Sequence, residues 1–252
     1  MSEEKIQLWN ERAQLGKTSG SDDYMLKDLE QQTFGERIEP NSKVLDIGCG
    51  DGKTLINLAK LNNCTGTGID FAADMIALSQ KNSEEAKTDD KINFEVKDLR
   101  NIEELGGSYD YVISERSLIN LDNTEEQHKV LQKAMSLLKP GGAFLMIECS
   151  EQGLKKVNKL RAKIGLNIIP NRWHNIFVDE EEVKSWQTEE ITLEELYPFS
   201  GTYYFLSRIV YAKLNQGQDL KYDSEINKLS CELPMGLTDV CSTKLWVWRK
   251  TR

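Results

Sequence analysis

The sequence predicts an α/β protein in which a parallel sheet carries helices on both faces. Short apolar segments alternate with helix-like segments as far as residue 148, which is the order of βαβ units. The apolar segments lie at residues 44–47, 65–69, 92–96, 109–114 and 143–148. Helix-like stretches lie between them at residues 53–61, 71–80 and 124–138. A glycine-rich turn, G-C-G-D-G, joins the first apolar segment to the first of these helices, as in many open α/β sheets.

Length and composition agree with one large domain, or with one domain and a cap. The chain has 252 residues, of which 39% are hydrophobic and 29% charged, an ordinary proportion for a soluble protein. The first 14 residues are polar and do not resemble a signal peptide. No apolar run approaches the roughly 18 residues of a membrane helix. We therefore expect a cytoplasmic protein without a membrane partner.

Cysteine usage and charge argue against two further classes of protein. The five cysteines are odd in number and include no C-x-x-C pair, which is typical of reduced thiols. We therefore predict neither a disulfide framework nor a metal site. The formal net charge of −9 argues against a nucleic-acid partner.

The glycine-rich turn and a later acid predict a site for a nucleoside. Gly48, Gly50 and Gly52 would let the backbone turn sharply and approach a ligand closely. The helix behind them would offer free N–H groups. Asp70 ends the second apolar segment about 20 residues after the turn, where a carboxylate suits the two hydroxyls of a ribose.

The spacing of the turn and the acid before it distinguish between ligands. A dinucleotide site is typical of G-x-G-x-x-G, whereas this turn reads G-x-G-x-G and has no Lys or Arg directly before it. Asp46, two residues before the first glycine, would repel a pyrophosphate but would hold an ammonium group. S-adenosylmethionine (SAM) has a ribose and an amino group and no phosphate. An NAD(P) site, or a glycine-rich turn in another α/β domain, is the alternative interpretation.

At these residues the chain resembles the class I SAM-dependent methyltransferases. The segment V-L-D-I-G-C-G-D-G resembles their first motif, and Asp70 resembles the acid that ends their second strand. The segment L-L-K-P-G-G-A-F-L at residues 137–145 also resembles this fold. The resemblance is specific for residues 42–148 and weaker beyond. It implies a doubly wound, seven-stranded, mostly parallel sheet whose last strand, expected at residues 240–248, is antiparallel.

We expect residues 1–252 to form a single domain with three parts. Residues 1–40 would be an N-terminal helical cover, and residues 42–149 the cofactor-binding core. Residues 150–252 would supply the substrate-side elements and the closing strands. In this last part we expect helices at 150–164 and 201–214, a strand at 192–196 and a polar lid at 215–239.

The resemblance also implies which residues bind SAM. The N-terminal cover would fold over the cofactor and pair Arg12 with its carboxylate, although Trp9 and Arg12 could equally be core packing and a surface charge. Met75 is expected to face the adenine, and Asp98 and Leu99 to meet its amine and its ring. The full predicted set is Trp9, Arg12, Asp46, Gly48, Cys49, Gly50, Asp70, Phe71, Met75, Asp98, Leu99, Ser114 and Glu115.

The chemistry of methyl transfer indicates what else the site needs. The nucleophile, the methyl carbon and the sulfur must lie in line, so orientation is the main contribution of the protein. A base is needed only for an acceptor that is protonated at neutral pH, such as an alcohol. His174 is the predicted catalytic base because imidazole titrates near neutrality and the residue lies in the polar and aromatic segment R-W-H-N. The alternative is a histidine that bonds the backbone of its own loop.

Arginines and tyrosines in the later part of the chain are predicted to bind the acceptor. Guanidinium groups suit a carboxylate or a phosphate, so we expect a small, negatively charged acceptor that is methylated on oxygen. The segments R-W-H-N and T-Y-Y-F-L-S-R look similar to methyltransferases of bacterial surface-polysaccharide and secondary-metabolite pathways. The predicted substrate-binding residues are Arg116, Asn120, Arg172, Asn175, Tyr203, Tyr204 and Arg208.

Two other functions remain as alternatives. An RNA or protein methyltransferase would need a basic face beside the crevice, which the net charge argues against. A SAM-binding subunit without catalysis would keep the glycine-rich turn and would need no base. The sequence leaves open both the identity of the acceptor and the choice between a monomer and a homodimer.

Overall fold

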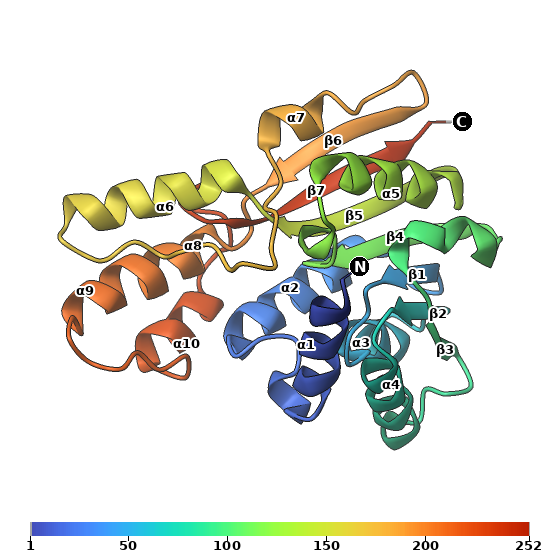
Figure 1. The fold of residues 1–252 in the computed structure, drawn as a ribbon, viewed down its shortest axis with the longest axis horizontal. Helices are drawn as coiled ribbons and strands as arrows, with labels where there is room; N and C mark the ends of the chain where they lie inside the picture. Colours follow the sequence, from blue (N-terminus) through green and yellow to red (C-terminus); the bar gives the residue numbers. More distant parts are fainter. Residues whose placement is uncertain (1, 252) are drawn as a thin grey trace.

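The computed structural model describes residues 2–251, which are organised around a seven-stranded sheet (Figure 1). The strand order is β3-β2-β1-β4-β5-β7-β6. Strand β7 lies between β5 and β6 and runs antiparallel to both, whereas the other neighbouring strands are parallel. The predicted doubly wound, mostly parallel sheet with an antiparallel last strand is therefore confirmed. The strands are β1 (Lys43–Ile47), β2 (Thr65–Asp70), β3 (Ile92–Val96), β4 (Tyr109–Glu115), β5 (Leu138–Cys149), β6 (Ile191–Tyr197) and β7 (Thr243–Lys250).

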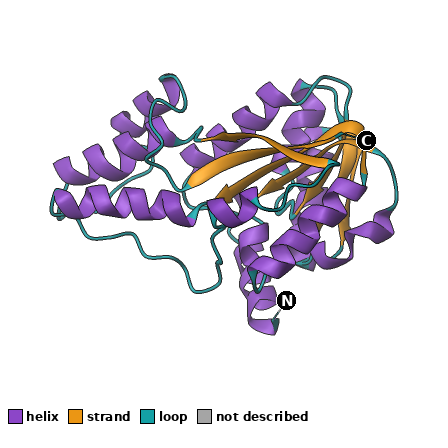
Figure 2. Ribbon diagram, turned by 90° about the horizontal axis from the view of Figure 1, so that it is seen from above, coloured by secondary structure: helices purple, strands orange, loops and turns teal. Residues whose placement is uncertain are grey.

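Helices cover both faces of this sheet (Figure 2). Three short 3₁₀ segments accompany the α-helices: η1 (Gly16–Thr18), η2 (Leu99–Leu105) and η3 (Leu118–Asn120). The α-helices are α1 (Glu3–Ala13), α2 (Tyr24–Arg37), α3 (Lys53–Leu61), α4 (Ala73–Ala86), α5 (Thr124–Ser136), α6 (Glu151–Lys163), α7 (Glu180–Lys184), α8 (Gly201–Tyr204), α9 (Ala212–Leu214) and α10 (Glu225–Glu232).

Side chains that alternate along the strands divide the core into two apolar layers. Val44 packs in one layer with residues of α2, α3, α6 and α8, and Leu45 packs in the other with residues of η2, α5 and α7. This alternation is the period of two that a strand imposes. Asp46 is the next residue along β1 and is 1% exposed, so a carboxylate is buried near the carboxyl end of the central strand.

The C-terminal part forms a lobe of helices beyond the strand ends (Figure 1). The predicted helix at residues 201–214 is confirmed in its extent, and its middle part is π-helical, because α8 continues into the segment Phe205–Tyr211 before α9. The predicted polar lid at residues 215–239 contains α10, which the sequence analysis did not predict. Ser224 caps this helix by accepting a hydrogen bond from the Asn227 amide.

The helices within residues 2–251 are each too short or too polar to span a bilayer.

Candidate functional site

A cavity of about 270 Å³ lies where β1, β2 and β4 end. Open α/β sheets bind ligands in a crevice at this edge. The N-terminal cover, the glycine-rich turn, the ends of β2, β4 and β5, and the C-terminal lobe all contribute to its lining. The predicted residues that the structure brings together there are Trp9, Gly48, Cys49, Gly50, Asp70, Phe71, Met75, Leu99, Glu115, Arg116, Asn120, Arg172, His174, Asn175, Tyr204 and Arg208.

The glycine-rich turn has a backbone that glycine alone fits. Gly48 has a φ of +77°, and a Cβ added there would lie 2.3 Å from the Cβ of Ser117. The amides of Gly48 and Cys49 both donate to the carbonyl of Ile69 at 2.8 Å, which fixes the turn against β2. A Cβ added at Gly50 would meet nothing within 4 Å. The backbone at Gly50 therefore stands open on the cavity side, as close approach of a ligand requires.

Asp70 fastens the same turn from the end of β2. Its Oδ2 accepts a hydrogen bond from the Gly50 amide at 3.1 Å, and its Oδ1 accepts one from the Ala72 amide at 2.9 Å. Burial raises the pKa of Asp70 to about 6, although these amide hydrogen bonds favour the carboxylate. Each carboxylate oxygen has two lone pairs, so both retain acceptor capacity for the hydroxyls of a ligand.

Asp46 lies in the protein interior, outside the lining of the cavity. Neither of its carboxylate oxygens has a hydrogen-bond partner among the described residues. Burial raises its pKa well above the usual value, and the nearby Glu115 adds to this effect. The prediction that Asp46 holds an ammonium group therefore stays a prediction, and the structure places the residue behind the wall of the cavity.

Arg12 is the clearest departure from the predicted cofactor site. Its guanidinium donates to the carbonyl of Ser19 at 2.6 Å and to that of Thr18 at 2.8 Å. It also pairs with Asp22 at 3.4 Å. Arg12 therefore bonds the loop that follows α1 and is absent from the cavity lining, so the expected pairing with a cofactor carboxylate has no support in the structure.

Asp98 and Ser114 also stand outside the lining. Asp98 forms an ion pair with Arg100 at 2.6 Å, and the hydrogen bonds to Arg100 lower its pKa despite partial burial. Ser114 is buried and donates to Glu148 Oε1 at 2.7 Å. The sequence correctly predicted that these two residues lie at strand ends, but it could not predict the hydrogen-bond partner of each side chain.

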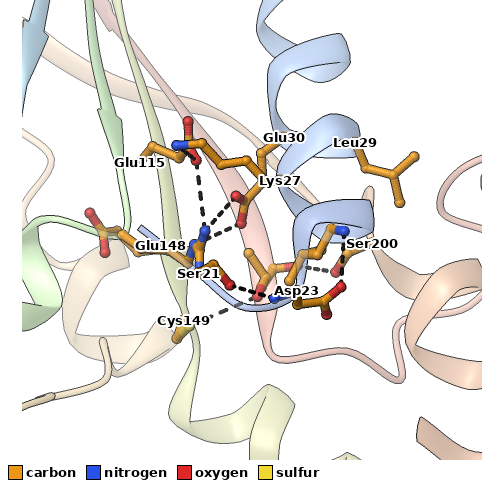
Figure 3. A network of polar contacts seen from close by, with 12 residues as sticks. Ser21, Asp23, Lys27, Leu29, Glu30, Glu115, Glu148, Cys149 and Ser200 are labelled. Carbon is orange, nitrogen blue, oxygen red and sulfur yellow. Dashed lines mark hydrogen bonds and ion pairs between the residues drawn. The ribbon is translucent and has the colours of Figure 1, made fainter. Parts of the chain in front are cut away.

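A buried cluster of four charged groups joins α2 to the end of β4 (Figure 3). Lys27 pairs with Glu115 at 2.6 Å, and Arg116 pairs with Glu30 at 2.9 Å. Thr54 donates to the second carboxylate oxygen of Glu115 at 2.5 Å. Burial disfavours the charged form of Glu115, but the charges of Lys27 and Arg116 outweigh this and lower its pKa to about 2. Glu115 is therefore a poor proton acceptor at neutral pH.

Arg116 reaches this cluster through an uncommon backbone conformation. Its φ is +55°, in the left-handed region that residues other than glycine seldom adopt. This conformation ends β4, and the guanidinium is held by Glu30 and lies 3.7 Å from Glu115. Arg116 lines the cavity, but its charge is already matched within the protein.

Arg208 lies on the opposite side of the cavity, in the π-helical segment. It pairs with Asp23, and its guanidinium carbon lies 5.5 Å from the ring centre of Tyr204 and 5.1 Å from that of Tyr222. Tyr203, which lies outside the lining, donates its hydroxyl to Asp23 at 2.6 Å. Asp23 therefore joins the N-terminal cover to the C-terminal lobe across the cavity, and we name Asp23, Tyr203 and Arg208 the latch.

His174 lies in the long connection between α6 and α7. Its ring is 6.2 Å from that of Trp9 and 5.3 Å from that of Trp173, edge-on in both cases. Burial and the charges of Arg172, Lys5 and Arg12 lower its pKa, so the imidazole is neutral at pH 7. Its Nδ1 is buried and has no hydrogen-bond partner among residues 2–251.

Several functional residues escaped the sequence analysis. In sequence they look like surface residues or ordinary strand residues, although Asp23, Glu30 and Glu148 are buried, and Lys27 and Tyr222 half-buried, at or beside the cavity. The only available signal for two of them was a charged residue within the N-terminal helical cover expected at residues 1–40. These residues are Asp23, Lys27, Glu30, Glu148 and Tyr222.

Comparisons with known proteins agree with this geometry. A family profile described as a methyltransferase domain matches residues 38–190. The ubiquinone biosynthesis O-methyltransferase of Xanthomonas campestris is 24% identical over 205 residues, covering 76% of each chain. The 27-O-demethylrifamycin SV methyltransferase of Amycolatopsis mediterranei is 26% identical over 137 residues, which cover 52% of this chain and 49% of that relative. This second match therefore spans about half the length of the relative.

A solved structure extends the likeness to the whole fold. The geranyl diphosphate C-methyltransferase of Streptomyces coelicolor A3(2), in complex with S-adenosyl-L-homocysteine, aligns with a TM-score of 0.60 and 14% identity. The alignment covers 91% of this chain and 82% of that one. At this level of identity the likeness concerns the fold alone.

Proposed function

This chain belongs to the methyltransferase-domain family and is a class I SAM-dependent methyltransferase, and from this premise we propose that it methylates an oxygen atom of a small, negatively charged acceptor. SAM is its methyl donor. When bound, SAM supplies an electrophilic methyl group on a sulfonium.

The donor side of the cavity is formed by the glycine-rich turn and the end of β2. The open backbone at Gly50 and the free acceptor capacity of Asp70 fit a nucleoside, with the Asp70 carboxylate on the ribose hydroxyls. Met75 and Leu99 are buried and line the cavity, and we assign them to the adenine ring. The buried Asp46 would act on the cofactor through the turn, because it is absent from the lining.

Arg208 is the observation that carries the proposal of an anionic acceptor. Its side chain is 19% exposed and lines the cavity among tyrosine rings. A guanidinium has five N–H donors, and the hydrogen bonds of Arg208 within the described chain go to Asp23 and Ser207. Donors therefore remain for a carboxylate or phosphate. Arg208 pairs with one carboxylate, Asp23, whereas Arg116 has two, Glu30 and Glu115, so we assign Arg116 to the architecture of the site.

His174 supports oxygen as the methylated atom. An alcohol must lose its proton as it attacks the methyl carbon, and a neutral imidazole with a free nitrogen can accept that proton. The lowered pKa of His174 keeps the imidazole neutral at pH 7, and no described residue donates to or accepts from its buried Nδ1. Arg172 and Asn175 flank it in the lining, and we assign them to orientation of the acceptor.

The function is tested by following a labelled methyl group. The protein is incubated with SAM carrying a ¹³C-methyl group and with an extract of small molecules separated by anion exchange. We expect the label to enter the anionic fraction and the product to show the carbon resonance of an O-methyl group. Label in RNA, in protein or only in neutral and cationic fractions would contradict the proposal. Tight binding of SAM without transfer to any fraction would favour a non-catalytic subunit.

Two substitutions assign the roles of the acceptor-side residues. His174→Gln should lower kcat by about 10²- to 10⁴-fold, the usual contribution of a general base. Its matched control is His128→Gln, because His128 stacks on Trp186 at 4.9 Å and is absent from the cavity lining. Arg208→Gln should raise KM for the anionic acceptor more than it changes kcat. An unchanged kcat in His174→Gln would remove His174 from the proposed mechanism.

Three further proposals concern the location, the acceptor class and the organisation of the protein. The free state of the five cysteines supports a reducing, cytoplasmic location. A surface-polysaccharide precursor as acceptor rests on the segments R-W-H-N and T-Y-Y-F-L-S-R alone, and neither curated relative above is named for such a substrate. The three-part organisation, with a cover at residues 1–40, a core at 42–149 and substrate-side elements at 150–252, agrees with all three parts lining the cavity.

A further inference from the structure

Glu148 is a fully buried carboxylate that collects donors from one short loop. It is the penultimate residue of β5 and is 0% exposed. Its Oε1 accepts hydrogen bonds from the amides of Ser117 at 3.1 Å and Leu118 at 2.9 Å. Oε2 faces the amide of Ile119 at 3.4 Å. Three successive backbone N–H groups thus point at a single side chain, and the hydroxyl of Ser114 donates to it as well.

The loop that Glu148 holds, residues 117–119, packs against the glycine-rich turn. Ser117 donates its hydroxyl to the carbonyl of Ile47 at 2.8 Å. The position of a Cβ on Gly48 lies 2.3 Å from the Ser117 Cβ, so the turn and the loop are in direct contact. A shift of Ser117 would therefore remove a packing contact of the glycine-rich turn, which forms the donor side of the cavity.

The other side of the same loop holds the connection that carries His174. The amide of Ile176 donates to the carbonyl of Ile119 at 2.7 Å. Gln127 bridges the two segments, because its amide group donates to Leu118 O at 3.2 Å and to Ile176 O at 2.8 Å. The loop is therefore fixed on one side to the donor half of the cavity and on the other to the acceptor half.

We propose that Glu148 is a positioning residue that sets the donor half and the acceptor half of the cavity at a fixed relative position through residues 117–119. The assignment of one half of the cavity to the acceptor rests on the proposed function. Methyl transfer requires its reacting atoms in line, so a residue that fixes two walls relative to each other contributes to the rate without touching either reactant.

The surroundings of Glu148 explain why the loop depends on it. None of the ion pairs within residues 2–251 includes Glu148, and Lys244, opposite it on β7, is paired with Glu180. Figure 3 shows Glu148 directed away from the cluster of Lys27 and Glu30. The loop amides and the Ser114 hydroxyl are thus the groups that stabilise this buried carboxylate, and Glu148 is in turn the acceptor for these amides.

The test is a graded series at this position. Glu148→Gln keeps one acceptor oxygen and places an NH₂ group opposite a loop amide, whereas Glu148→Met removes all acceptors. We expect the dissociation constant of S-adenosyl-L-homocysteine, measured by calorimetry, to rise about two- to tenfold in the first variant and further in the second, since each lost hydrogen bond is worth roughly two- to tenfold.

A spectroscopic readout reports on the acceptor half. Trp173 is 62% exposed and lies beside His174. The emission of Trp173 is obtained by subtracting the spectrum of the same protein with Trp173→Phe. We expect this emission to change in Glu148→Gln. The matched control is Glu180→Gln, because Glu180 is also a buried carboxylate, is paired with Lys244 and is absent from the cavity lining.

The outcomes decide the proposal. Weaker S-adenosyl-L-homocysteine binding together with a changed Trp173 emission, both absent from Glu180→Gln, supports it. Equal losses in Glu180→Gln, unchanged affinity in both Glu148 variants, or a change in only one half of the site overturns it. If neither Glu148 variant folds, Ser114→Ala removes a single donor and must show the same two effects in smaller measure. Absence of methyl transfer by the unmodified protein would instead count against the proposed function.

Discussion

Individual carboxylates in this site differ in what surrounds them, and their pKa values follow. Glu115 lies between Lys27 and Arg116, which hold its pKa at about 2. Asp70 and Glu148 are buried without a cation, and burial raises their pKa values to about 6 and about 7. Carboxyl groups at and beside one cavity therefore differ in their average charge near neutral pH.

The raised pKa of Asp70 predicts a pH dependence of cofactor binding. If the carboxylate accepts the ribose hydroxyls, protonation with a pKa of about 6 weakens S-adenosyl-L-homocysteine binding. At pH 5, one unit below that pKa, the contribution of Asp70 should make binding about tenfold weaker than at pH 7. Calorimetric titrations between pH 5 and 8 measure this. The Asp70→Asn variant should bind more weakly at pH 7 and should lose the inflection near pH 6.

Protonation of Asp70 affects the stability of the folded protein in the opposite direction: it favours folding, whereas it weakens ligand binding. Its pKa in the folded state, about 6, lies above the ordinary 3.8. The folded protein therefore binds the proton more tightly than the unfolded chain, and the resulting stability is fully present below pH 3.8 and is lost as pH rises through 6. If the free energy of unfolding shows an inflection near pH 6 that persists unchanged in Asp70→Asn, another group causes it.

At the scale of elements, helix α2 joins the core to the site. Leu26 and Leu29 pack in the apolar layer, while Lys27 and Glu30 enter the charged cluster at the end of β4. One turn of helix thus contributes both to folding and to the shape of the cavity. The N-terminal cover is for this reason part of the site rather than an appendage.

Removing one charge from that cluster should be costly. Lys27→Met leaves Glu115 buried with a more distant cation, Arg116 at 3.7 Å. We expect a loss of about 3 kcal/mol in the free energy of unfolding, the lower end for a broken buried pair, because Lys27 is partly exposed to the cavity. Urea titrations measure the change.

The control for this prediction is an ion pair at the surface. Lys129 pairs with Glu125 across one turn of α5, and both are exposed. Lys129→Met should leave the urea midpoint unchanged within error. Similar losses in the two variants would show that the cluster at β4 contributes no more than a surface pair. Adding Glu115→Gln to Lys27→Met should recover part of the loss, since it removes the unmatched charge.

Elements made by local sequence were predicted well, and contacts between distant elements were not. The alternation of strands and helices along the chain follows from the apolar pattern, and the glycine-rich turn follows from residues such as Gly48, whose role is set by neighbours within a few positions. Arg12 and Tyr203 lie near the predicted places, yet bond a loop carbonyl and Asp23 instead. Lys27 and Glu30 read as surface charges because their partners are nearly 90 residues away in sequence. Spacing along one helix carries no information about such partners.

At the scale of the whole molecule, the N-terminal cover and the C-terminal lobe meet over the sheet through the latch. Asp23 comes from the cap of α2, and Tyr203 and Arg208 from the lobe. Both parts and the sheet edge between them line the cavity, so a ligand that fills it would contact all three. Its binding should therefore stabilise the folded molecule as a whole.

This linkage predicts a thermal shift with S-adenosyl-L-homocysteine. At about 100 times its dissociation constant the ligand adds about 2.7 kcal/mol to the free energy of unfolding. For a chain of this size that corresponds to a rise in Tm of roughly 5–10 °C. Scanning calorimetry measures it, with NAD⁺ at the same concentration as the control. A shift with NAD⁺ and none with S-adenosyl-L-homocysteine would refute the assignment of the glycine-rich turn.

The π-helical segment Phe205–Tyr211 offers a simple route by which the acceptor preference of this protein can change. A π-helical stretch holds one residue more than the α-helical path between the same ends. Deleting a single codon there would restore the α-helical path between the same ends and would change which side chains of the segment face the cavity. Arg208 would then exchange its place among the tyrosines for a neighbouring side chain. One small genetic step could thus replace a guanidinium by another group at the acceptor wall and leave the donor half untouched.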